Sequence, residues 1–110
     1  MTNPEGALNQ LEGGIIQAAS WALKKGVPLD TGGISSRDWE SYPVLRFSEV
    51  PEIEVELVDP VSDNPPLGVG EASGGPTVAA IGNAVAHALG ARLRDLPLTR
   101  DRVMAALLKA

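Results

Sequence analysis

At 110 residues, the chain has the length of one domain (residues 1–110) with a modest core. Its net charge of −5, from 14 acidic and 9 basic residues, excludes the basic stripe that nucleic-acid binding requires. The chain contains no cysteine, which excludes a disulfide, an iron–sulfur cluster or a cysteine-ligated zinc site formed by its own residues. No membrane span and no signal peptide are visible in the sequence, so the compartment stays unknown, with the cytoplasm as the default expectation.

The N-terminal quarter predicts an amphipathic helix from about residues 5–7 to residue 25, because apolar residues recur at helical spacing. Gly26 and Pro28 are typical of its end. Gly13 and Gly14 lie inside this helix, where each glycine costs roughly 1 kcal/mol relative to alanine. That cost predicts that a backbone or a ligand packs closely at this point.

The middle of the chain predicts extended structure. Residues 29–38 read as an irregular connector with a turn signal at Asp30–Gly33, and residues 42–47 as a short edge segment containing a proline. The clearest strand is 53–58, where Ile, Val and Leu alternate with glutamates. One buried and one wet face predict an antiparallel or edge position.

Two further helices are predicted near the C-terminus. Apolar residues recur from residue 77 to residue 89, and Gly90 is a natural C-cap. Thr99 is a plausible N-cap for a third helix. The chain therefore predicts an α+β fold, a two-layer sandwich of helices on one face of a small sheet. The strands are too few for a complete sheet, so we expect a partial domain of something larger, prone to poor stability or self-association in isolation.

The loop 64–76 holds one carboxylate, Glu71, among glycines and prolines. Such a loop can hold an acid for general-base chemistry, although a solvated turn residue is the common alternative. Gly68-x-Gly70 does not continue into a dinucleotide-binding fingerprint. The helix that opens at Gly74 could receive an anion or be an ordinary helix start.

Outside the loop, two residues are candidates for ligand contact. Gln10 can read the polar edge of a cofactor through its amide, or simply lie on a helix surface. His87, the only histidine, reads as a surface or packing residue. One histidine and no cysteine do not assemble a metal site, so we predict none within the chain.

Two stretches together resemble the molybdopterin-binding large subunit of the xanthine dehydrogenase and aldehyde oxidase family, in its C-terminal part. Asn3-Pro4 followed by Gln10-Leu11-Glu12-Gly13-Gly14 is similar to the family's "NP…GQxEGG" helix. Pro66-Leu67-Gly68-Val69-Gly70-Glu71, followed by Ala79-Ala80-Ile81-Gly82-Asn83-Ala84, is similar to its "GVGE…AAIxNA" segment. The likeness covers nearly the whole chain and is greatest to isoquinoline 1-oxidoreductase and nicotinate dehydrogenase large subunits.

The resemblance implies roles for particular residues. Glu71 matches the family's general base beside molybdenum, in the oxidative hydroxylation of an aldehyde or an N-heteroaromatic carbon by water. Gln10 matches a glutamine that contacts the molybdopterin cofactor, and Gly68 and Gly70 fall where the backbone must approach the cofactor or the rest of the subunit. The usual proline after the family's glutamate is replaced here by Ala72-Ser73.

The chain is much shorter than the family's large subunit. The resemblance therefore implies a fragment or split subunit that is inactive alone and binds molybdopterin only when other polypeptide completes the pocket. Its implied partners are the remainder of the molybdenum-binding subunit and an iron–sulfur subunit. The alternative is a free-standing remnant without catalysis, a binding or interaction module of the same fold.

Overall fold

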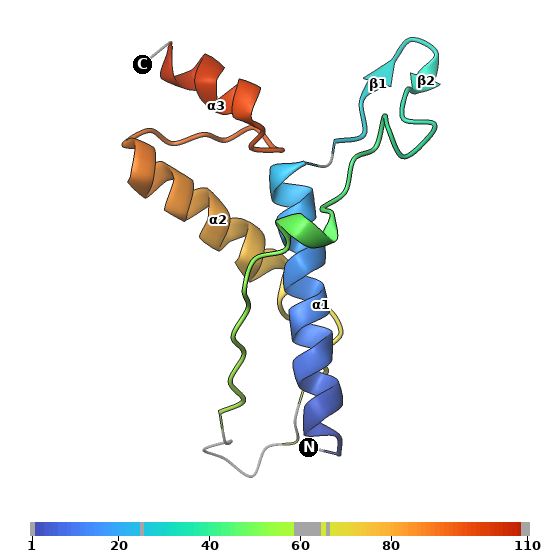
Figure 1. The fold of residues 1–110 in the computed structure, drawn as a ribbon, viewed down its shortest axis with the longest axis vertical. Coiled ribbons are helices and arrows are strands. Elements are labelled where there is room, and N and C mark those ends of the chain that lie inside the picture. Colours follow the sequence, from blue (N-terminus) through green and yellow to red (C-terminus); the bar gives the residue numbers. More distant parts are fainter. Residues whose placement is uncertain (1, 25, 59–64, 66, 109–110) are drawn as a thin grey trace.

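The computed structural model describes residues 2–24, 26–58, 65 and 67–108. Within them lie three α-helices, α1 (Pro4–Leu23), α2 (Gly74–Leu89) and α3 (Arg100–Leu107). A two-stranded antiparallel sheet pairs β1 (Leu29–Asp30) with β2 (Gly33–Ile34), and a short 3-10 helix, η1 (Phe47–Glu49), follows (Figure 1). The predicted α+β class is confirmed.

Helix α1 is the central element of the fold. Its N-cap is Asn3, whose Oδ1 accepts a hydrogen bond from the Gly6 amide at 2.9 Å, and Pro4 occupies the first turn. The helix ends at Leu23, two residues before the predicted end. Its buried side chains are small, namely Ala7, Ala18, Ala19, Ser20 and Ala22. Small side chains let a neighbouring segment approach the α1 backbone closely.

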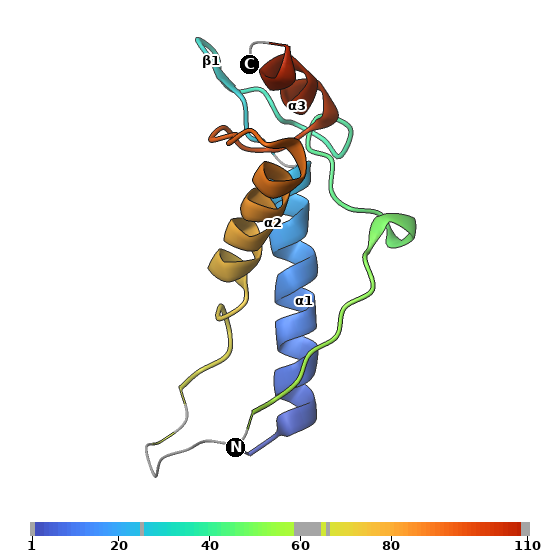
Figure 2. The same ribbon diagram turned by 90° about the vertical axis from the view of Figure 1, so that its left-hand side faces the viewer.

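Helix α2 packs against α1, and this is the one helix–helix contact among the described residues (Figure 2). The contact passes through Gly14 of α1. A Cβ placed on Gly14 would overlap the Oγ atom of Ser73, which directly precedes α2, whereas a Cβ on Gly13 would meet nothing within 4 Å. A close neighbour at the glycine pair is thus found for Gly14, but it is a serine side chain of the same chain and not the predicted backbone or ligand.

The predicted C-cap of α2 and the predicted N-cap of α3 are confirmed. Gly90 caps α2 with a left-handed backbone at φ 67°, which favours glycine. Thr99 caps α3, because its Oγ1 accepts a hydrogen bond from the Arg102 amide at 3.4 Å. The segment between the helices is tied to α1 by the Leu98 amide, which donates to the Ala22 carbonyl at 2.6 Å.

The sheet is a hairpin built around the predicted turn. The Asp30 carboxylate accepts a hydrogen bond from the Gly32 amide at 2.7 Å, and Gly33 follows with φ 107°. The register pairs Leu29 with Ile34 and Asp30 with Gly33. These two-residue strands are too short to show periodicity in the sequence. All four strand residues are exposed, so the helices do not cover this sheet as a second layer.

Two of the predicted extended segments differ from the structure. Residues 43–46 are irregular and lead into η1, so the predicted edge segment is wrong at its C-terminal end. Glu49 stabilises this turn, because its Oε2 accepts a hydrogen bond from the Arg46 amide at 2.9 Å. Residues 53–58 are extended but form no ladder among the described residues. Neither segment has a neighbouring strand to pair with, and pairing is what stabilises a strand.

The chain is far from compact. Its Cα radius of gyration is 17.1 Å, whereas about 13 Å is typical of a folded domain of this length. Its accessible surface is 8689 Å², whereas a folded monomer of its mass exposes about 5,800 Å². Large apolar side chains lie in this surface, and Trp39 and Phe47 are 80% and 101% exposed. The open shape agrees with a partial domain of a larger subunit.

Among the described residues, no helix is both long and apolar enough to cross a membrane.

Candidate functional site

The structure brings Gln10 and the Gly68–Glu71 loop together, although they lie sixty residues apart in the sequence. Gln10 extends from α1, and its Nε2 donates a hydrogen bond to the Gly70 carbonyl at 2.8 Å. In both ribbon views this loop runs upward to the start of α2 (Figures 1 and 2). The bond uses one of the two amide hydrogens of Gln10. Among the described residues, its Oε1 and other hydrogen have no protein partner.

Glu71 directly follows the carbonyl that Gln10 holds. Its own carbonyl accepts a hydrogen bond from the Gly74 amide at 3.3 Å, and the Ala72 amide donates to the Val69 carbonyl at 3.4 Å. These bonds wind the loop into a turn just before α2. The Glu71 side chain is exposed and has no hydrogen-bond partner among the described residues. The turn therefore fixes where the backbone of Glu71 lies and leaves its carboxylate accessible.

The position before α2 also suits a carboxylate electrostatically. Ser73, the N-cap residue of α2, makes no side-chain capping bond. The Gly74 amide donates to the Glu71 carbonyl, and Pro76 has no amide hydrogen. Among the described residues, Gly75 therefore carries the one unbonded amide of the first turn, and the positive end of the helix dipole favours a nearby acid. This purely structural role for Glu71 does not require a ligand.

The glycines of the loop are not explained by the chain's own structure. Gly68 and Gly70 do not have a positive φ, so their backbone conformation is open to other residues. A Cβ at either position would meet no atom within 4 Å, so internal packing does not require glycine either. Neither the backbone conformation nor the packing of the described residues therefore accounts for these glycines.

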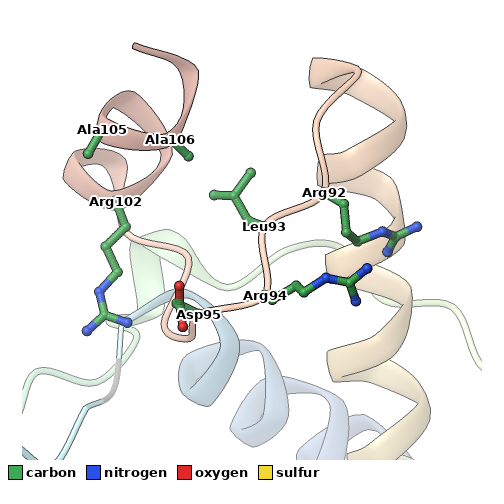
Figure 3. A pocket seen from close by; sticks show the side chains of 7 residues that line it. All are labelled: Arg92, Leu93, Arg94, Asp95, Arg102, Ala105 and Ala106. Atoms are coloured by element: carbon green, nitrogen blue, oxygen red, sulfur yellow. The ribbon is translucent and has the colours of Figure 1, made fainter. Parts of the chain in front are cut away.

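A hollow of the described surface lies away from the Gln10–Gly70 contact. It has a volume of about 600 Å³ and lies between the end of α2 and α3, lined by Arg92, Leu93, Arg94, Asp95, Arg102, Ala105 and Ala106 (Figure 3). Its guanidinium groups do not converge, because Arg92 and Arg94 extend one way and Arg102 the other. Arg92 donates to Asn83 Oδ1 at 2.7 Å and Arg102 to the Leu96 carbonyl. These arginines hold the chain together rather than forming an anion pocket.

The two carboxyl groups whose pKa is shifted, Glu49 and Asp38, lie outside the Gly68–Glu71 loop. The hydrogen bond and ion pair with Lys24, followed by the bond from the Arg46 amide, lower the pKa of Glu49. Hydrogen bonds from the Ser41 side chain and amide lower the pKa of Asp38. The Asp38 contacts are local to one turn, whereas the Lys24 ion pair joins the end of α1 to η1. No cluster of three possible metal ligands occurs among the described residues.

Comparison with known proteins shows what the chain is similar to. The chain is 44% identical, over 97% of its length, to a subunit of nicotinate dehydrogenase from Pseudomonas putida. It is 39% identical, over 89% of its length, to the beta subunit of isoquinoline 1-oxidoreductase from Brevundimonas diminuta. It is 34% identical, over 93% of its length, to the aldehyde oxidoreductase molybdenum-binding subunit of Escherichia coli K12. No protein-family model matches the chain.

The chain is homologous to part of the molybdenum-binding subunits of the xanthine dehydrogenase and aldehyde oxidase family. The resemblance inferred from the two motifs is thereby confirmed. The chain spans 9% to 15% of the length of these relatives. The rest of a molybdenum-binding subunit lies in sequence that this chain does not contain.

Sequence reasoning missed Ser73 as a positioning residue. Its Oγ lies where α1 has Gly14, so it sets how closely the loop carrying Glu71 approaches the helix carrying Gln10. The glycine pair was the available signal, because it predicted a close neighbour without identifying it. The bond between Gln10 and Gly70 left no local signal in the sequence.

Proposed function

We propose that this chain supplies the catalytic base and part of the cofactor pocket to a molybdenum hydroxylase whose active site is completed by other polypeptide. The observation that carries the proposal is the hydrogen bond from Gln10 to Gly70. It joins the two motifs that resemble the family's cofactor-contacting helix and its base-bearing loop. Residues 1–110 would act as one unit that presents both motifs on a shared surface.

The residues around this bond fit a molybdopterin cofactor. The free Oε1 and remaining N–H of Gln10 offer one acceptor and one donor to the polar edge of a pterin. Gly68 and Gly70 leave the loop open to close approach, as their empty surroundings indicate. Gln10, Gly68 and Gly70 would therefore hold the cofactor, while most of its contacts would come from the rest of the subunit.

Glu71 is proposed as the general base. Bound molybdenum cofactor would supply the two-electron oxidation in these enzymes. In the substrate, an aldehyde or an N-heteroaromatic compound, a hydroxyl group from water replaces a carbon-bound hydrogen, so that two electrons and two protons leave. The Glu71 carboxylate would accept one of these protons as the new carbon–oxygen bond forms. Its exposure on the isolated surface suits a group that faces a reaction centre built by another polypeptide.

The proposed partners follow from what the chain lacks. The remainder of a molybdenum-binding subunit would cover part of the surface of the chain, which exposes roughly 2,900 Å² more than a compact monomer does. An iron–sulfur subunit would accept the electrons, since the chain has no cysteine with which to ligate a cluster. The complete site would then have a route for both protons and electrons.

Fragment complementation tests this proposal. We would take the Pseudomonas putida nicotinate dehydrogenase subunit that the chain matches, delete its matched 107 residues, and co-express this truncated subunit with the chain and the enzyme's other subunits. We expect a stable complex that contains molybdenum and has nicotinate dehydrogenase activity. The control replaces the chain by the deleted stretch itself, and if that stretch does not reassociate, both segments are instead fused covalently into the gap.

The outcomes distinguish a split or fragmentary enzyme subunit from a non-catalytic module. Molybdenum loading with the chain in place supports a split or fragmentary subunit. If the native stretch restores the complex and this chain neither binds nor loads molybdenum, the proposed function is wrong and a non-catalytic module is favoured.

A further inference from the structure

The segment 51–58 has the side-chain pattern of a β-strand. Its backbone is extended, and the side chains of Ile53, Val55 and Leu57 are half-buried whereas the intervening Glu54 and Glu56 are exposed. A period of two in burial is what a strand with one covered face shows. In both ribbon views the segment descends beside α1 after η1 (Figures 1 and 2).

The backbone of this segment has no partner within the described part of the chain. No backbone hydrogen bond joins residues 51–58 to another segment. The only ladder described is the hairpin of β1 and β2, which is two residues long in each strand. An extended segment with unpaired amides and carbonyls is a template for pairing with another strand. Its local structure therefore lacks the contacts that would normally stabilise a strand.

We propose that residues 51–58 form a strand that docks by β-addition onto a sheet edge in the remainder of a molybdenum-binding subunit. This inference rests on the proposed function, which places such a polypeptide beside the chain. The relatives are far longer than the match, so at least 85% of their length lies outside it. The sheet that this strand completes lies in that missing part.

The charge of the exposed face specifies the partner further. Glu52, Glu54 and Glu56 point three carboxylates to the same side of the strand. Opposite charges directly across a ladder stabilise the pairing, and like charges oppose it. The docking strand should therefore present lysine or arginine beside these glutamates. In the unpaired chain the same charges disfavour edge-to-edge association of two copies.

Hydrogen exchange tests the docking directly. We would compare amide exchange of residues 51–58 in the isolated chain and in the complex with the truncated Pseudomonas putida subunit. We expect alternate amides of this segment to exchange about a hundredfold more slowly in the complex. Exchange as fast in a molybdenum-loaded complex as in the isolated chain overturns the strand while leaving the proposed function intact. Failure of this chain, but not the native stretch, to form the complex counts against the proposed function instead.

Two substitutions of Val55 distinguish the contribution of backbone hydrogen bonds to docking from that of side-chain burial. Val55→Pro removes a backbone donor and should weaken binding to the truncated subunit roughly tenfold. Val55→Thr keeps the backbone donor and the branched side-chain shape. In the complex formed by this variant, the same amides should exchange slowly as in the wild-type complex. Equal affinity of the wild-type and Val55→Pro chains, together with unprotected amides, overturns the proposal.

The charge component has its own measurement. Glu54→Lys/Glu56→Lys should weaken binding roughly tenfold at low salt, and the difference should shrink in about 0.5 M NaCl. The matched control, Glu54→Gln/Glu56→Gln, removes the charges without reversing them and should lie between the two. Unchanged affinity of the reversed-charge chain at low salt shows that the docking strand is not basic.

Discussion

In isolation, this chain should be unable to keep its structure as a monomer. The perturbation is simply purification of the 110 residues in isolation. The chain exposes roughly 2,900 Å² more surface than a compact monomer of its mass. With a little over half of that area apolar, the missing burial corresponds to roughly 40 kcal/mol of hydrophobic stabilisation. Even half that amount exceeds the net stability of an ordinary domain, about 5–15 kcal/mol.

Circular dichroism and sedimentation velocity provide the assay. We expect a broad thermal transition without a cooperative midpoint, and a sedimentation coefficient that rises with protein concentration as exposed apolar surface associates. Residues such as Phe47 and Trp39 form part of that surface. A sharp transition that is independent of concentration, from a monomer at all concentrations, would show that the open fold is stable by itself and refute the reasoning.

Two other predictions concern contacts within the chain. In the assembled complex, Gly13→Ala should slow hydrogen exchange along α1 by a factor corresponding to about 1 kcal/mol, because alanine favours the helix more than glycine does. Gly14→Ala should not, because its methyl group displaces the Ser73 hydroxyl. Adding Ser73→Ala to Gly14→Ala should restore the gain, and equal effects of the two single variants would contradict the packing described. Lowering the pH should weaken the turn at Glu49, because the pKa of this carboxyl is lowered in the folded state. Such a group stabilises the folded state above its unfolded pKa, and this contribution is lost as the pH falls through the folded pKa. Glu49→Gln should abolish this pH dependence of the protection factor of the Arg46 amide, and its persistence would place the titration elsewhere.

Local signals predicted the helices well and the strands poorly. The Thr99 cap and the Gly90 terminus were predicted because they depend on residues within one turn of the helix; the Asn3 cap is equally local but was not predicted. The strand predicted at 53–58 shows its expected alternation but has no ladder among the described residues, because a strand depends on a neighbour to pair with.

Parts of the candidate site were likewise predictable from local sequence, and one contact was not. The loop around Glu71 was visible from its glycines and prolines, and the close approach to α1 was predicted from Gly14. That Gln10 reaches Gly70 could not be predicted from local pattern, because no spacing rule links residues sixty apart. Only a resemblance that contained both motifs placed them in one site.

The central claim is that Glu71 is the base of an active site that other polypeptide completes. Its most direct test is Glu71→Gln in the complex of this chain with the truncated Pseudomonas putida subunit, with Glu71→Asp as the control that keeps the charge. We predict that Glu71→Gln loses about a hundredfold or more of the nicotinate dehydrogenase activity while molybdenum content and complex yield stay at wild-type levels. Full activity of Glu71→Gln in a molybdenum-loaded complex would contradict the account.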